Sequence, residues 1–430
     1  MWLRREATTA ALKARCGAVR TCARKLIALA IPVALLLLPA GASSAPLGPV
    51  TTAAACNLVA SPAGSDTASG TLAAPFQTVQ KLVDSLTPGQ TGCVETGTYD
   101  EDVRIAQGGV AGAPVTLAAY PGDSPTIVGR MQIVEGANYV TVTGLNLNGE
   151  NPAQGLSPVI DANDVTFSYD DVTNDDTGIC FGIGSATWGW ATGTLITHDR
   201  IHDCGQPNEN YQHGLYIGAA TDTTIEWNLI YANAARGIQL YPDAQHTTID
   251  HNVIDDNGEG ILISGANGLA SSYTNIYDNI ITGATARHDV ESYWPEGNPV
   301  GVDNTVHDNC LWGGREGTMG TADGGYTYSH NLTANPQYVN ASDHDYELHA
   351  TSPCLVMSGD PQAAVDGVPP VQPTAATVLA TRRELAVIAR RKRGDQLPPQ
   401  PSQRLPLFAG DAAATGAAGE AAETSAGQLR

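Results

Sequence analysis

Short runs of alternating apolar and polar residues return at a fixed interval through the middle of the chain. The pattern x-Gly-apolar-x-apolar occurs at 213–217, 236–240 and 259–263, which are steps of 23 residues. Between these copies, 223–230 (TTIEWNLI) returns 24 residues later as 247–254 (TTIDHNVI), with weaker versions at 165–172, 195–201, 275–281 and 306–311. The alternation predicts short β-strands, with Ile225, Leu229 and their equivalents on one face and Thr, Glu and His on the other.

A repeat of this length predicts a solenoid, because one coil cannot bury its apolar face and stacked coils build a continuous core. Helical repeats are disfavoured, since β-branched residues and glycine recur without a 3.6-residue period. The asparagine before each second strand, such as Asn228 or Asn252, is expected to take the left-handed turn conformation and to hydrogen-bond its own backbone.

The two ends of the chain differ from this body. Residues 1–45 combine a basic leader, an apolar run from Leu26 to Leu38 and small residues, as in a secretory signal peptide with cleavage near Ala42 or Ala45. An uncleaved anchor is the alternative, and no second apolar stretch is long enough to span a bilayer. Residues 374–430 are expected to form a basic helix and a disordered tail, whose run 390–393 could touch an anionic envelope or stay solvated.

Charge excludes one class of partner. The 430 residues include 22 basic and 44 acidic side chains, and 46–373 hold 7 of the basic and 38 of the acidic ones, a net charge of −31. So acidic a body repels nucleic acid. It also argues against a polyanionic glycan unless a bound cation or a local arginine bridges the charges.

Six cysteines remain after the leader, and an even number in an exported chain predicts disulfides. Fifteen pairings are possible, and we favour Cys56–Cys93, Cys180–Cys204 and Cys310–Cys354. Cys180 and Cys204 are 24 residues apart, which is about one coil of the repeat. A metal site is disfavoured here because no CxxC spacing occurs.

The repeat resembles that of the pectate lyase superfamily. Further likeness lies in the opening segments 61–66 (SPAGSD), 75–80 (PFQTVQ) and 97–99 (GTY), and in the closing segments 331–339 (NLTANPQYV) and 352–354 (SPC). The resemblance implies an all-β fold, a right-handed parallel β-helix solenoid with an N-terminal capping helix. Phe76, Val79, Leu82, Val83 and Leu86 have the spacing of such a helix. The expected divisions are a signal peptide (1–45), a cap and opening segment (46–95), the β-helix (96–340), a closing segment (341–373) and the tail (374–430).

The best candidate site uses the aligned strands, because equivalent residues of successive coils stack at about 4.7–4.9 Å and build a linear groove. His213, Arg236 and Glu259 share one repeat position, and Tyr216, Gln239 and Leu262 share another. For a uronate lyase, Arg236 would neutralise the sugar carboxylate, His213 would be the base, and Tyr216 or Tyr211 the acid. The expected substrate-binding residues are Asn210, Gln212, Gln239, Tyr241, Asp243 and Glu259. A solvent-facing ladder held by hydrogen bonds is the structural alternative.

Two further chemistries stay open. Asp170, Asp171, Asp175 and Asp176 could hold Ca²⁺, which pectate lyases resembling this fold use to bridge enzyme and substrate. Paired carboxylates on adjacent coils could instead hydrolyse a glycoside. If the base is an arginine, as in many lyases of the superfamily, Arg236 comes first and Arg200 second. Sugar rings could stack on Trp188, Trp190, Trp227, Trp294 and Trp312.

The sequence therefore predicts a secreted, extracellular, monomeric protein that binds and cleaves an extracellular polysaccharide as a lyase acting by β-elimination. A glycoside hydrolase and a non-catalytic glycan-binding surface protein are the alternatives. Unsaturated products identify a lyase, reducing ends without unsaturation identify a hydrolase, and binding alone identifies a surface protein.

Overall fold

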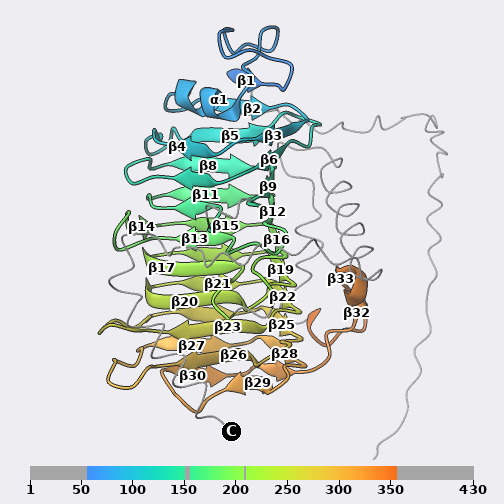
Figure 1. Ribbon diagram of the computed structural model, residues 1–430. Helices are drawn as coiled ribbons and strands as arrows, with labels where there is room; N and C mark the ends of the chain where they lie inside the picture. The colour runs from blue at the N-terminus through green and yellow to red at the C-terminus, as the bar shows by residue number, and fades with distance from the viewer. Residues whose placement is uncertain (1–55, 151–154, 208–209, 356–430) are drawn as a thin grey trace, which may run out of the picture. The chain divides into compact units, whose positions relative to one another are not determined.

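The computed structural model describes residues 56–150, 155–207 and 210–355. Three parallel sheets run along a solenoid, and the chain passes from one sheet to the next in every coil (Figure 1). The repeat pattern therefore predicts the fold correctly. The expected signal peptide and basic tail lie outside the described residues. Within these ranges, no helix combines the length and the apolar character needed to cross a bilayer.

The strands of each sheet follow one another along the solenoid. Sheet 1 contains β1 (Leu58–Ala60), β2 (Thr91–Val94), β5 (Val115–Ala119), β8 (Val140–Thr143), β11 (Val165–Ser168), β15 (Leu195–Thr197), β18 (Thr224–Glu226), β21 (Thr248–Asp250), β24 (Asn275–Tyr277), β27 (Asn304–His307) and β30 (Tyr326–Ser329). Sheet 2 contains β4 (Val103–Ile105), β7 (Met131–Ile133), β10 (Val159–Ile160), β13 (Phe181–Ile183), β17 (Leu215–Thr221), β20 (Arg236–Gln245), β23 (Glu259–Ser264), β26 (His288–Tyr293) and β29 (Gly317–Gly320), with β14 (Ala191–Thr192) beside β17. Sheet 3 contains β3 (Thr98–Asp100), β6 (Thr126–Val128), β9 (Asn146–Asn148), β12 (Asp171–Thr173), β16 (Arg200–His202), β19 (Leu229–Tyr231), β22 (Val253–Asp255), β25 (Ile280–Thr282), β28 (Cys310–Trp312) and β31 (Leu332–Thr333).

The helix α1 (Val79–Ser85) lies at the N-terminal end of the described chain, beside β1 and β2 (Figure 1). Thr78 caps it by accepting a hydrogen bond from the amide of Lys81, and Val79, Leu82 and Val83 join the solenoid core. Because β1 and β2 pair within sheet 1, the coils begin upstream of residue 96, where we expected the β-helix to start.

An asparagine ladder stacks along the turn between sheets 1 and 3, formed by Asn228, Asn252, Asn279, Asn309 and Asn331. The Oδ1 atom of each of the last four accepts the backbone amide of the preceding member at 2.9–3.0 Å. The expectation that these asparagines are left-handed is wrong. The residue before each of them takes that conformation instead, as in Trp227 (φ 57°) and His251 (φ 54°), because the asparagine must point inward to reach the next coil.

The expectation that Ile225 and Leu229 share a face is also wrong. Ile225 and Ile230 belong to the core inside the coils, whereas Leu229 belongs to a second apolar cluster on the outer side of sheet 3. The turn between β18 and β19 resets the alternation. Leu229 is buried because residues of a C-terminal hairpin, β32 (Tyr338–Asn340) and β33 (Asp345–Leu348), joined through the 3₁₀ helix Ala341–Asp343, pack over it.

The three favoured cysteine pairings are all present. Cys56–Cys93 ties the first residues of the described chain to β2, Cys180–Cys204 links neighbouring coils, and Cys310–Cys354 ties the segment after the hairpin to β28. The last two cysteines are both fully buried, so this disulfide fixes the hairpin segment to the solenoid.

Candidate active site

The main predicted residues do gather on the outer side of sheet 2. Tyr216 of β17 pairs in register with Gln239 of β20, which pairs with Leu262 of β23. Arg236 lies opposite Glu259 in the same ladder. The shared repeat positions therefore become neighbouring positions in space, as a parallel solenoid requires.

Arg236 and Glu259 form a buried ion pair. The Nε atom of Arg236 lies 3.0 Å from Oε2 of Glu259, and its Nη1 donates to the backbone carbonyl of Asn210. Glu259 is only 1% exposed. Burial raises the pKa of Glu259 to about 8, against the lowering by Arg236 and with a further rise from Glu291. The predicted substrate-binding Glu259 thus stabilises the position of Arg236.

His213 lies next to this pair and is only 2% exposed. Burial, followed by the positive charge of Arg236, holds the pKa of His213 well below its usual value. Its ring stacks on that of Tyr216 at 6.1 Å, and its side chain faces Gln239. Among the described residues, its Nδ1 atom has no hydrogen-bond partner. This nitrogen is buried, and a neutral imidazole with an unpaired nitrogen has the chemistry to accept a proton.

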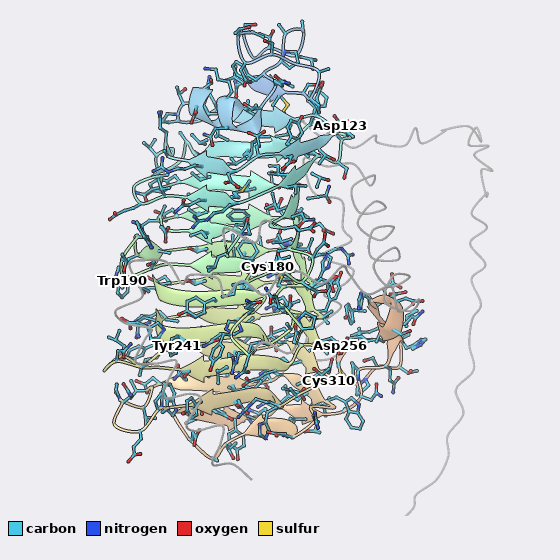
Figure 2. All side chains as sticks on the ribbon, viewed as in Figure 1. Asp123, Cys180, Trp190, Tyr241, Asp256 and Cys310 are labelled. Carbon is cyan, nitrogen blue, oxygen red and sulfur yellow. A yellow bond between two sulfur atoms is a disulfide. The ribbon has the colours of Figure 1, made fainter. Side chains whose placement is uncertain are left out.

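Tyrosines surround the buried group. Tyr216 is half-buried, and the ring of Tyr241 lies 6.2 Å from it. Burial raises the pKa of Tyr241, so its hydroxyl stays protonated. Tyr211 is 51% exposed and does not belong to this packed group. Figure 2 labels Tyr241 and Trp190, and Trp190 precedes β14, which pairs with β17.

Two predicted substrate-binding side chains have local partners instead. Gln212 accepts the backbone amide of Gln206 at 2.6 Å, and Asp243 accepts from Gln245 at 2.7 Å. Asn210 contacts Arg236 through its backbone carbonyl. Their roles in substrate binding stay predictions.

Sequence reasoning missed the residues that the next coil adds. On β26, Glu291 pairs in register with Leu262, and it accepts hydrogen bonds from Arg287 at 2.6 Å and from His288 at 2.5 Å. Leu262 and Glu291 are 29 residues apart, whereas Gln239 and Leu262 are 23 apart. In this longer coil, His-Asp-Val-Glu (288–291) stands in place of the x-Gly-apolar pattern. The repeat pattern therefore did not identify Glu291 as the residue next to Leu262. Glu291 could have been found by extending the repeat to the next coil and allowing that coil a greater length.

The four predicted Ca²⁺ ligands have separate neighbours. Both carboxylate oxygens of Asp170 accept backbone amides, from Leu145 at 2.7 Å and from Ser168 at 3.2 Å. Asp171 lies 3.4 Å from His202, Asp175 accepts from Asn148 at 2.9 Å, and the amide of Asp176 bonds to the carbonyl of Asp203. In the part of the chain that the structure describes, the acidic and histidine side chains whose ligand atoms converge within 4.8 Å are those of His288, Glu291 and Glu316. Ca²⁺ binding by the four aspartates stays a prediction.

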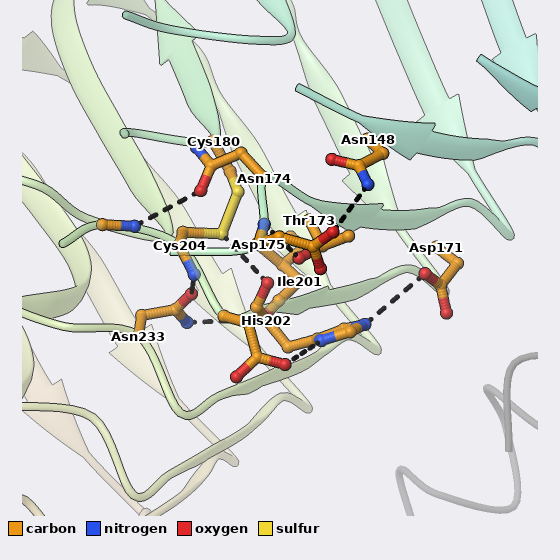
Figure 3. A network of polar contacts seen from close by, with 12 residues as sticks. Asn148, Asp171, Thr173, Asn174, Asp175, Cys180, Ile201, His202, Cys204 and Asn233 are labelled. Atoms are coloured by element: carbon orange, nitrogen blue, oxygen red, sulfur yellow. Dashed lines mark hydrogen bonds and ion pairs between the residues drawn. A yellow bond between two sulfur atoms is a disulfide. The ribbon is translucent and has the colours of Figure 1, made fainter. Parts of the chain in front are cut away.

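His202 forms a charged network beside the Cys180–Cys204 disulfide on sheet 3 (Figure 3). Burial lowers the pKa of His202, but Asp171 and Asp203 on either side of the ring outweigh it and raise that pKa to about 10. His202 is therefore protonated at neutral pH and is unsuited to act as a base. The second arginine candidate, Arg200, is buried on the same strand β16, in a different sheet from Arg236.

The five tryptophans predicted to stack on sugar rings differ in how far their rings are exposed. Trp188 and Trp190 are each 47% exposed, and Trp312 is exposed as well. Trp227 is half-buried, and its ring stacks on that of His251 at 4.2 Å and lies 6.4 Å from that of His198. Trp294 donates to the carbonyl of Gly324. Of these five tryptophans, Trp188, Trp190 and Trp312 present the exposed aromatic surface that a sugar ring needs.

Comparisons with known proteins agree with the fold. Residues 133–324 match the family described as "Right handed beta helix region". A stretch of 78 residues is 42% identical to pectate lyase PEL9 of Emericella nidulans and covers 18% of this chain and 19% of that protein. The match thus spans about a fifth of the length of the curated relative.

Two solved structures superpose over most of their length. The match to pectate lyase Pel9A covers 70% of this chain and 91% of the Pel9A chain, with a TM-score of 0.50 at 13% identity. A rhamnogalacturonan lyase covers 69% and 95%, with a TM-score of 0.50 at 14% identity. At these identities the likeness shows the fold.

Proposed function

We propose that this chain, a right-handed parallel β-helix protein with the pectate lyase-like fold, is secreted and cleaves an extracellular polysaccharide by β-elimination. Three disulfides and the similarity to pectate lyase PEL9 support secretion and a carbohydrate substrate. The signal peptide that secretion requires is predicted for residues outside the described ranges.

The observation that carries the proposal is a neutral imidazole on sheet 2 that lies beside the charge of Arg236 and stacks on the ring of Tyr216. His213 would take the proton from C5 of a uronate, and the electron pair of the C5–H bond would form a C4–C5 double bond. The C4–O bond would break, and its electron pair would leave with the oxygen. Tyr216 would donate its proton to the leaving oxygen. Arg236 has N–H groups besides those bound to Glu259 and Asn210, and these would pair with the sugar carboxylate.

Burial favours this division of roles. His213 is neutral at pH 7 because burial lowers its pKa, and a tyrosine hydroxyl such as that of Tyr216 is protonated at this pH. A base and an acid in one site need environments that push their pKa values apart. Half-buried Tyr216 is the part of the packed group that a glycan would meet first.

The test is the release of reducing ends from a panel of uronate and neutral polysaccharides. His213→Gln removes the base while keeping a polar side chain of similar size, and we expect activity to fall by about 10²–10⁴-fold. His246→Gln changes an exposed histidine and serves as the matched control. Equal activity of the two variants would remove His213 from the mechanism, and a wild-type chain that is inactive on the whole panel would refute the proposed function.

A glycoside hydrolase is the second candidate, and one pair of residues favours it. Glu226 and Asp250 lie opposite each other on adjacent strands of sheet 1, and Asp250 bonds to His251 at 2.8 Å. Burial and then the charge of Asp250 raise the pKa of Glu226, as a general acid needs. Loss of activity in Glu226→Gln, with His213→Gln unaffected, would favour this site.

A further inference from the structure

Three metal-ligating side chains converge at the C-terminal end of sheet 2. His288 begins β26, Glu291 lies on the same strand, and Glu316 directly precedes β29 on the next coil. One ligand atom from each lies within 4.8 Å of the other two. Glu291 is buried, His288 is half-buried and Glu316 is exposed, so the group reaches from the packed sheet to solvent.

An unsatisfied atom behind this cluster gives a second, independent observation. Glu259 on the neighbouring coil is 1% exposed, and its Oε1 atom has no hydrogen-bond donor within the described part of the chain. Its other oxygen is held by Arg236, and its carboxylate lies against that of Glu291. Two buried carboxylates in contact repel each other unless a cation or a proton lies between or beside them.

The next coil leaves room for the imidazole and the carboxylate. A Cβ atom built on Gly320 would lie 2.7 Å from Cβ of Glu291 and 2.8 Å from Nδ1 of His288. Any larger residue at this position would displace both ligands. Arg287 also fixes Glu291 by donating to it at 2.6 Å, which is the kind of outer support that orients a metal ligand.

Charge balance points the same way. When Glu259, Glu291 and Glu316 are all ionised, three carboxylates face the two guanidinium groups of Arg236 and Arg287, and a bound cation would compensate the remaining negative charge. One imidazole nitrogen with two carboxylate oxygens is a donor set for Zn²⁺ or Mn²⁺, whereas Ca²⁺ prefers oxygen ligands alone.

We propose that His288, Glu291 and Glu316 bind a divalent transition-metal ion, with Zn²⁺ preferred over Ca²⁺ and with Glu259 as the carboxylate behind the site. This site differs from the four aspartates that the sequence suggested, and it does not depend on the proposed lyase activity.

Isothermal titration calorimetry with ZnSO₄, MnCl₂ and CaCl₂ tests the proposal on the full chain, purified without an affinity tag and treated with chelator. We expect one equivalent of Zn²⁺ to bind, with weaker binding of Ca²⁺. His288→Gln and Glu316→Gln should each raise the Kd for Zn²⁺ by about tenfold or more. Glu316 is exposed, so its replacement leaves the fold intact, and a thermal melt confirms this for both variants.

His307→Gln is the matched control, because His307 also pairs its Nδ1 with a carboxylate, that of Asp308 at 2.8 Å. Its Kd for Zn²⁺ should equal that of the wild type. Three results would overturn the proposal: no stoichiometric uptake of Zn²⁺, uptake that survives both substitutions, or Ca²⁺ binding as tight as that of Zn²⁺. Absence of uptake would mean that a proton alone compensates the two carboxylates.

Discussion

Two aspartates occupy positions that the asparagine ladder fills with asparagine elsewhere. Asp199 accepts the amide of Asp170 at 2.7 Å, and its own amide bonds to Asn228 at 2.8 Å. An asparagine in the ladder also donates through Nδ2, as Asn228 does to Asn252 and to the carbonyl of Ile196. An ionised aspartate cannot donate, and in the described chain Oδ2 of Asp199 has no partner.

Asp199→Asn should therefore stabilise the protein at neutral pH. Burial, and then the charge of Asp170, raises the pKa of Asp199 well above its usual value. Its contribution to stability is present below the unfolded pKa of about 4 and is lost as pH rises through the raised folded value. Urea unfolding should show the variant more stable by roughly 1–3 kcal/mol at pH 8. The advantage should shrink toward pH 4, and a constant difference across this range would contradict the account.

The repeat copies identified His213, Arg236 and Glu259 as neighbours, because equal spacing in sequence becomes stacking in space. Sequence alone could not show that Arg236 is already paired with Glu259 or that His213 is buried, since both facts depend on the packing of several coils. Glu291 was missed because its coil is longer. Which residues stack on neighbouring regular coils was therefore predictable, whereas their pairing and burial, and the residues of the longer coil, were not.

The C-terminal hairpin decides which face of sheet 3 is apolar. Leu229, Val253 and Ile280 point outward from the coils and are fully buried together with Tyr346 of β33. Local alternation placed these residues with the inner core, because a strand pattern shows that a face is covered and not which element covers it. The apolar runs Leu229-Ile230 and Val253-Ile254, with two adjacent buried residues, were the available signal for a strand covered on both sides.

Replacing both Cys310 and Cys354 by serine should loosen the hairpin first. The disulfide closes a loop across 44 residues, and its loss should cost about 2–5 kcal/mol. Hydrogen exchange should increase in β32 and β33, with sheets 1 and 2 still protected. Cys56→Ser with Cys93→Ser is the control, because it affects the other end of the solenoid. Uniform loss of protection along the chain would show that the hairpin is not a separate unit.

Substitutions of Val253 and Ile254 should differ in how their cost in stability depends on the Cys310–Cys354 disulfide. Ile254→Ala leaves a cavity inside the coils and should cost about 2–5 kcal/mol whether or not the hairpin is docked. Val253→Ser should be costly only while the hairpin covers it. Urea unfolding of each substitution, alone and with the two cysteine substitutions, measures this. Equal coupling to the hairpin at both positions would refute the assignment of the two faces.

On the scale of the whole molecule, residues 46–373 carry a net charge of −31, which works against a polyuronate substrate. Arg236, Arg287 and the proposed cation site are places on sheet 2 where this repulsion is locally reduced. The fold itself was predictable from the repeat, because every coil restates the same pattern. The substrate was not predictable, because it depends on a few side chains and on the electrostatic field of the acidic body.

Salt should therefore strengthen the binding of a polyuronate. The Debye length falls from about 30 Å at ~0.01 M to about 8 Å at ~0.15 M, which screens the repulsion between the body and the glycan. The KM for a uronate polymer should fall by about twofold or more over this range, and that for a neutral polymer should stay constant. A KM for the polyuronate that rises with salt would mean that local arginines dominate over the net charge.

The ratio of unsaturated ends to reducing ends in one digest tests the claim of β-elimination most directly. The wild-type chain is incubated with a uronate polysaccharide, and the absorbance of the unsaturated product and the new reducing ends are measured in the same sample. The account predicts one unsaturated end for each new reducing end, with both lost in His213→Gln. New reducing ends without unsaturation would contradict it and assign the chemistry to a hydrolase.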